Sequence, residues 1–208
     1  MLPTPAELGL GSPFLWLAGR ILAEDRVGGW VVAVQIGGKP DAGFDDPLGM
    51  LVDCHRRVER FLNILCRVVE RAEGRALSGE ETEAVEAALR YFSESGPRHN
   101  SDEEESLFPR LRSGEGRDVL AEVDRLEGEH VEAEALHHET AELYARWKAE
   151  GGLEGVDRGR LRAATGRLEK IYGEHIRIEE EVVFPRAKKV LEPSAVAAMG
   201  EEFRSRRA

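Results

Sequence analysis

The chain has 208 residues, enough to bury one sizeable hydrophobic core. Its 40 acidic and 29 basic residues give a formal net charge of −11, which repels the phosphates of nucleic acids and anionic membrane surfaces. It has no apolar run long enough to span a bilayer, and the N-terminal stretch GLGSPFLWLAG lacks the basic flank of a signal peptide. We therefore expect a cytoplasmic protein that binds neither nucleic acid nor membranes.

Residues 1–44 are predicted to form an irregular N-terminal extension. They hold the strand-like stretch GGWVVAVQIGG and most of the turn-rich stretch GGKPDAGFDDP, in which glycine and proline interrupt regular structure. The extension contains no partner motif that we recognise.

The next two helices are predicted from their end signals and apolar spacing. Asp46 can cap a helix that has Pro47 in its first turn, and apolar residues then recur at three- and four-residue spacing. A second helix begins at the capping box SGEE and meets Gly96 and Pro97. A kink or a restart is expected there, followed by a second helical segment to about residue 112.

Two further helices complete the predicted domain. One spans about 116–150 and ends at a pair of glycines, and the other spans about 156–191 and ends before a proline. Long amphipathic helices with short polar connections predict an all-α fold, an antiparallel up-down four-helix bundle. We assign the bundle to residues 45–192 and a C-terminal tail to residues 193–208.

One eleven-residue motif occurs twice in the chain. HNSDEEESLFP recurs 76 residues later as HIRIEEEVVFP, and in both a histidine is followed four residues on by a glutamate. Two further histidines lie 75 residues apart on the apolar seams of the first and third helices. Each predicted helix therefore carries one element of the order His, His-x3-Glu, His, His-x3-Glu. The residues of this pattern are His55, His99, Glu103, His130, His175 and Glu179.

This pattern predicts a metal site inside the bundle. Residues i and i+4 share one helix face, so each His-x3-Glu pair can direct an imidazole and a carboxylate to one point. Buried carboxylates are costly without cations, and two divalent metals would compensate the two glutamates. Nitrogen and oxygen ligands suit first-row transition ions, and the absence of usable thiolates argues against a structural zinc cluster.

A simpler interpretation exists for each histidine taken alone. Glutamate is abundant, so a His-x3-Glu pair by itself is more typical of a solvated hydrogen bond on a helix face. The repeated motif together with His55 and His130 on apolar seams favours the dinuclear site over this interpretation. We assign His138 to the rim. His137 shares a face with His130 and is predicted to cap the site rather than to bind metal.

Other residues near the pattern have open or minor roles. Glu59 and Glu134 lie one turn beyond His55 and His130 and are expected to face inward. They are either additional ligands or, as we favour slightly, groups that accept hydrogen bonds from ligand imidazoles or shuttle protons. Glu129 is expected on a different, solvated face. The two cysteines, Cys54 and Cys66, lie too far apart on one helix to pair and are interpreted as small buried residues.

At these residues the sequence resembles the hemerythrin-like, or HHE cation-binding, domain family. The resemblance covers about residues 46–191 and rests on the duplicated HxxxEExxLFP-type signature. It implies an antiparallel four-helix bundle with a non-haem di-iron centre. In that arrangement His55 and His99 bind one iron, His130 and His175 bind the other, and Glu103 and Glu179 bridge the two.

The sequence departs from the oxygen-carrying hemerythrins in two places. Those proteins have a second histidine four residues after the third-helix histidine, where this chain has Glu134, and their last acidic ligand follows its histidine by five residues rather than four. Reversible oxygen carriage is therefore doubtful. The ligand order looks instead like that of the iron-sulfur-repair di-iron proteins linked to nitric oxide stress, although their cysteine-bearing N-terminal domain is not visible here.

Two functions stay open on this basis. The first, which we favour, is a di-iron protein that binds or reacts with oxygen, nitric oxide or peroxide in sensing, stress response or iron maintenance. Any enzymatic activity would then be a di-iron redox reaction, and other divalent metals also fit the ligands. The second is a metal-stabilised helical module that contacts a protein partner or a second copy of the chain without redox chemistry.

Overall fold

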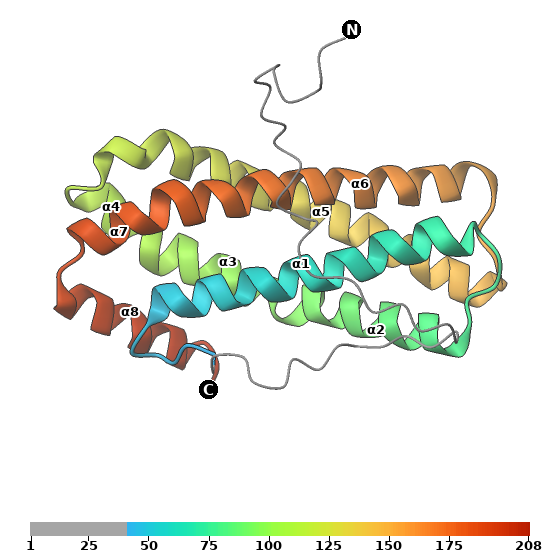
Figure 1. Cartoon of the computed structure of the whole chain (residues 1–208), viewed down its shortest axis with the longest axis horizontal. Coiled ribbons are helices and arrows are strands. Elements are labelled where there is room, and N and C mark those ends of the chain that lie inside the picture. Colours follow the sequence, from blue (N-terminus) through green and yellow to red (C-terminus); the bar gives the residue numbers. More distant parts are fainter. Residues whose placement is uncertain (1–40) are drawn as a thin grey trace, which may run out of the picture. The chain divides into compact units, whose positions relative to one another are not determined.

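The computed structural model describes residues 41–208 of the chain, and all regular structure in this range is helical (Figure 1). The predicted all-α fold is thereby confirmed. The strand-like stretch of the N-terminal extension lies outside the described residues. Between residues 41 and 208, no helix is both long and apolar enough to cross a membrane.

Four long helices form the body of the bundle. They are α1 (Pro47–Ala72), α2 (Gly79–Glu94), α5 (Leu120–Glu150) and α6 (Gly155–Ile178). α1 packs against α2 and α6, and α5 packs against the same two helices, so the contacts form a closed ring (Figure 1). Such a ring of antiparallel neighbours encloses one interior, in which side chains from all four helices can meet.

α1 and α2 begin at the predicted caps. The Asp46 side chain accepts a hydrogen bond of 3.0 Å from the Gly49 amide, and Ser78 and Glu81 form the predicted capping box of α2. α1 ends at a left-handed turn in which Gly74 has φ of 86°. A Cβ atom there would lie 2.0 Å from the Leu153 carbonyl oxygen, so only glycine fits where the two turns at this end of the bundle meet.

The second and fourth arms of the bundle each contain a π-helical segment. After α2, the chain continues through α3 (Gly96–Ser101), the π-helical η2 (Asp102–Leu107) and α4 (Phe108–Ser113). After α6, it continues through the π-helical η4 (Glu179–Val183) and α7 (Phe184–Val190). The predicted restart at Gly96 is confirmed by α3. A short 3₁₀ turn, η3 (Arg117–Val119), leads into α5.

The repeated Phe-Pro step explains why both π segments occur. The amides of Phe108 and Phe184 donate to the carbonyls of Glu103 and Glu179, five residues earlier rather than four. The proline that follows each phenylalanine has no N–H, and its ring would clash with a carbonyl four residues before it in a regular α-helix. The wider turn relieves that clash. Because the motif is duplicated, the distortion is duplicated with it.

Two apolar clusters fill the bundle on either side of a polar layer. On α1, Leu51 belongs to one cluster, Val58 belongs to the other, and the buried His55 lies between them. On α5, Leu126 and Ala133 flank the buried His130 in the same way, which completes the layer. The histidines of the sequence pattern therefore lie at one level of the bundle, between the two apolar clusters.

The last helix was not anticipated from the sequence. Within the predicted C-terminal tail, residues 193–208, Pro193–Ser205 form α8, which packs against α1 and η2. Met199 and Phe203 are fully buried in the apolar cluster of that end of the bundle. Arg206 and Arg207 follow the helix and reach Asp102, which is completely buried.

Candidate metal centre

The six residues of the sequence pattern converge in the polar layer of the bundle. All six are buried, and their ligand atoms form two overlapping groups within which these atoms lie no more than 4.8 Å apart. One group joins His55 and His99 with both glutamates, and the other joins His130 and His175 with the same glutamates. Glu103 and Glu179 thus belong to both groups, as bridging ligands would.

The Nε2 atoms of the four imidazoles point toward the two carboxylates. His55 Nε2 lies 3.0 Å from Glu179 Oε2, and His175 Nε2 lies 3.4 Å from Glu179 Oε1. His99 Nε2 and His130 Nε2 each lie 3.4 Å from an oxygen of Glu103. Each carboxylate therefore sits between one imidazole of each group, which is the arrangement that a shared carboxylate needs.

The inward-facing atoms fit a bound cation. Both oxygens of Glu103, both oxygens of Glu179 and His55 Nε2 are buried without a hydrogen-bond partner in the part of the chain that the structure describes. Several uncompensated acceptors at one point are costly in a dry core, whereas coordination to divalent metals would satisfy them together. The donor set of imidazole nitrogens and carboxylate oxygens suits first-row transition metals.

The pKa values of the two carboxyl groups move in opposite directions. Burial raises the pKa of Glu103, and the nearby charge of Glu179 adds to that rise. Burial would also raise the pKa of Glu179, but the His175 and His55 rings outweigh it and hold this pKa well below its usual range. Without metal, the Glu103 carboxyl group therefore ionises less readily than the Glu179 carboxyl group.

The outward-facing Nδ1 atoms of three of the four histidines contact carboxylates that were not assigned to the site from the sequence. His55 Nδ1 lies 2.9 Å from Glu180 Oε1, and His130 Nδ1 lies 2.6 Å from Glu104 Oε1. His175 Nδ1 lies 3.1 Å from Glu129 Oε2. A carboxylate on Nδ1 fixes the ring with its proton on that atom and leaves Nε2 free for metal.

A signal for two of these acceptors was present in the sequence. Glu104 and Glu180 directly follow the two predicted bridging glutamates and are related by the same 76-residue offset. Glu129 was expected to be solvated, and that expectation is wrong, because its side chain is only 15% exposed and contacts His175.

Glu59 and Glu134 were expected to face inward, but neither lies among the buried residues of the polar layer. Both are exposed, and Glu59 forms an ion pair of 2.8 Å with Arg56 on its own helix. The inward positions one turn beyond the histidines belong to Val58 and Ala133, three residues on rather than four. Between residues 41 and 208 neither glutamate forms a hydrogen bond or ion pair with one of the four histidines, and Glu134 lines the pocket that reaches His130.

The remaining histidines lie outside both groups. His137 Nε2 lies 3.0 Å from the Tyr172 hydroxyl oxygen, and its ring stacks on Phe92 with the centroids 4.1 Å apart. Burial lowers the pKa of His137 to about 4. This neutral imidazole lines a pocket of about 400 Å³ that also reaches His130. His138 is exposed, as expected for the rim.

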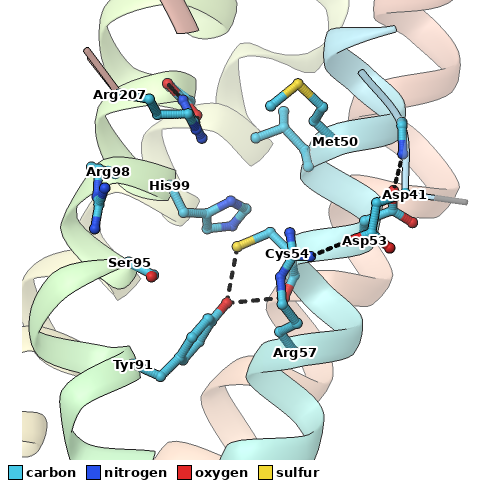
Figure 2. A pocket seen from close by; sticks show the side chains of 13 residues that line it. Asp41, Met50, Asp53, Cys54, Arg57, Tyr91, Ser95, Arg98, His99 and Arg207 are labelled. Carbon is cyan, nitrogen blue, oxygen red and sulfur yellow. Dashed lines mark hydrogen bonds and ion pairs between the residues drawn. The ribbon is translucent and has the colours of Figure 1, made fainter. Parts of the chain in front are cut away.

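A second pocket, of about 320 Å³, reaches the site from the side of His99 (Figure 2). Cys54 lines it, with the thiol sulfur 3.0 Å from the Tyr91 hydroxyl oxygen, and Tyr91 also donates to the Cys54 carbonyl at 3.2 Å. Cys54 and Cys66 are both free and half-buried. His99 Nδ1 is buried and has no hydrogen-bond partner between residues 41 and 208.

The comparisons with known proteins agree with this geometry. A protein of Haemophilus influenzae described as uncharacterized is 27% identical over 169 residues, which cover 80% of this chain and 92% of that protein. The family model of the hemerythrin HHE cation binding domain matches residues 46–190, which contain all six candidate ligand residues and both π-helical segments. The chain therefore belongs to the hemerythrin HHE cation-binding domain family.

Proposed function

We propose that this protein holds two iron ions and uses them to bind or to react with oxygen, nitric oxide or peroxide. The observation that carries the proposal is the pair of overlapping four-residue groups that share Glu103 and Glu179. His55 and His99 would hold one iron, and His130 and His175 would hold the other. Two shared carboxylates keep the two cations close and neutralise part of their mutual repulsion.

The protein would contribute position, charge and exclusion of water. Each imidazole is fixed between helices, and three of the four are oriented by an outer carboxylate. The apolar clusters on both sides lower the polarity around the layer, which strengthens the electrostatic interactions in it. When bound, the iron pair would supply electrons and an open coordination position for a small ligand.

Two features support reactivity rather than protected storage of oxygen. The third long helix has Glu134 where the oxygen-carrying hemerythrins have a ligand histidine, and this glutamate is exposed. One metal would therefore have fewer protein ligands. The pocket that reaches His130 offers a small molecule a route to that side of the centre. The resemblance to the iron-sulfur-repair di-iron proteins points to stress response or iron maintenance as the setting.

Metal analysis followed by ligand titration tests this proposal. Protein from iron-supplemented cells should carry close to two irons per chain, and a reproducible value near one would contradict the dinuclear site. The reduced, anaerobic protein should then change its near-ultraviolet and visible charge-transfer bands when oxygen, nitric oxide or peroxide is added. As a matched control, the variant Glu59→Gln changes an exposed glutamate that follows a ligand histidine by four residues and should respond like the parent.

The same experiment separates the alternative function. A metal that only stabilises the bundle would raise the melting temperature, because it binds the folded state, yet its spectrum would not respond to any of the three molecules. That outcome would favour a metal-stabilised module that contacts another protein.

A further inference from the structure

The four ligand imidazoles differ in the hydrogen-bond partner of their Nδ1 atoms. His55, His130 and His175 each have a glutamate oxygen within 3.1 Å of Nδ1. His99 has none, and its Nδ1 atom is buried without a partner among residues 41–208. Both histidines of the His130 and His175 group are thus supported by carboxylates, whereas only one histidine of the His55 and His99 group is.

The internal repeat identifies the residue responsible for this difference. Glu129, which supports His175, directly precedes His130, and the residue that directly precedes His55 is Cys54. Cys54 therefore stands, at the 75-residue offset, where the other half of the bundle has a carboxylate. Figure 2 shows Cys54 and His99 in the same pocket, with the thiol directed to Tyr91.

No other acid of the pocket replaces the missing carboxylate. Asp41 pairs with Arg57 at 2.7 Å, and Asp53 accepts the Ala42 amide at 2.6 Å. Asp102 is held by Arg206 and Arg207.

The absence of a carboxylate at His99 Nδ1 is expected to weaken metal binding by His99. A carboxylate that accepts the Nδ1 proton makes the imidazole a stronger donor at Nε2 and holds the ring in its binding orientation. Loss of such a partner typically lowers metal affinity by about 10- to 100-fold. The neutral thiol of Cys54 offers only a weak acceptor.

We propose that Cys54 makes the two metal positions unequal, so that the metal held by His55 and His99 is bound more weakly than the metal held by His130 and His175. Cys54 acts as a positioning residue through His99 and is not itself a ligand. The inference rests on the proposed function in one respect, namely that two metals bind. It adds which of the two is exchanged or lost first.

Cobalt(II) titration of the metal-free full-length chain tests the inference. The parent should bind two ions in separate steps. In Cys54→Glu, which supplies the carboxylate found in the other half, the affinity for the second ion should rise by about 10- to 100-fold. Cys54→Ser removes the thiol without adding a carboxylate and should bind both ions like the parent. Equal effects of the two substitutions would overturn the inference, because the thiol rather than the missing carboxylate would then be the cause.

The reciprocal variant tests the other half of the bundle and does not require that Cys54→Glu folds. Glu129→Cys gives His175 the environment of His99 and should lower the affinity for the first ion by a similar factor. Two bound ions with affinities unchanged in Glu129→Cys would overturn the inference and leave the dinuclear site standing. A parent that binds only one cobalt per chain would overturn the dinuclear proposal and this inference with it.

Discussion

Removing the two arginines that hold Asp102 should destabilise the bundle strongly. Asp102 is 1% exposed at its side chain and accepts from Arg206 at 3.0 Å and from Arg207 at 2.5 Å. Substitution of both arginines by methionine would leave a buried carboxylate without cations. Breaking buried pairs in this way costs about 3–5 kcal/mol, a large share of the roughly 5–15 kcal/mol by which domains are stable.

Urea unfolding of the metal-free protein measures this loss. With a slope of about 2 kcal/mol per molar urea, the midpoint should fall by about 1.5–2.5 M in Arg206→Met/Arg207→Met. Arg177→Ala is the matched control, because Arg177 is 49% exposed and pairs with Glu174 and Glu181 on the surface. Such surface pairs contribute about 0–1 kcal/mol, so its midpoint should stay close to that of the parent.

A double-mutant cycle with Asp102→Asn shows whether the carboxylate is the cause. In the Asp102→Asn background no buried charge is left unpaired, so the two arginine substitutions should cost clearly less than they do in the parent. An equal cost in both backgrounds would refute the reasoning, and so would a double variant within about 0.5 kcal/mol of the parent.

Three further results are expected. Because burial lowers the pKa of His137 to about 4 from its usual 6.5, the unfolded state binds more protons between these values, and stability should fall by up to about 3 kcal/mol as the pH drops from 6.5 to 4. His137→Gln should lose this part of the pH dependence, as urea midpoints at several pH values would show. Glu103→Ala should lower cobalt affinity more than removal of one histidine ligand does, whereas the exposed His138→Ala should bind like the parent in the same titration. Glu134→Gln should still bind two metals, and a metal count near one would place this glutamate among the ligands.

The internal repeat explains why the six inward-facing residues could be found from the sequence. Histidine and glutamate at i and i+4 share a helix face, but one such pair is ambiguous. The duplicated motif, together with His55 and His130 at the same offset, extends the pattern to all four helices. The same rule failed for Glu59 and Glu134. At a spacing of four a residue lies about 40° to one side of the histidine and at three about 60° to the other side, and here the bundle interior lies on the side of Val58 and Ala133.

The outer acceptors were harder to predict for a geometric reason. Glu104 and Glu180 directly follow inward-facing residues, and on a regular α-helix they would lie about 100° away from them. Both lie in π-helical segments, in which hydrogen bonds join residues five apart and the turn is wider than in the α-helix. The angle between neighbouring residues therefore differs from the α-helical value. The contact between Asp102 and the last arginines of the chain joins residues about a hundred positions apart, which no local pattern indicates.

The order of the ligands along the chain bears on how the molecule is divided. The first helical hairpin supplies His55, His99 and Glu103, and the second supplies His130, His175 and Glu179. In the proposed dinuclear site, each hairpin would therefore supply three ligands to one metal, and its glutamate would also bind the other metal. If the chain were cut between the hairpins, each fragment would hold an incomplete site, and metal binding would favour association of the two fragments. The centre is in this sense an interface between two similar halves of one polypeptide.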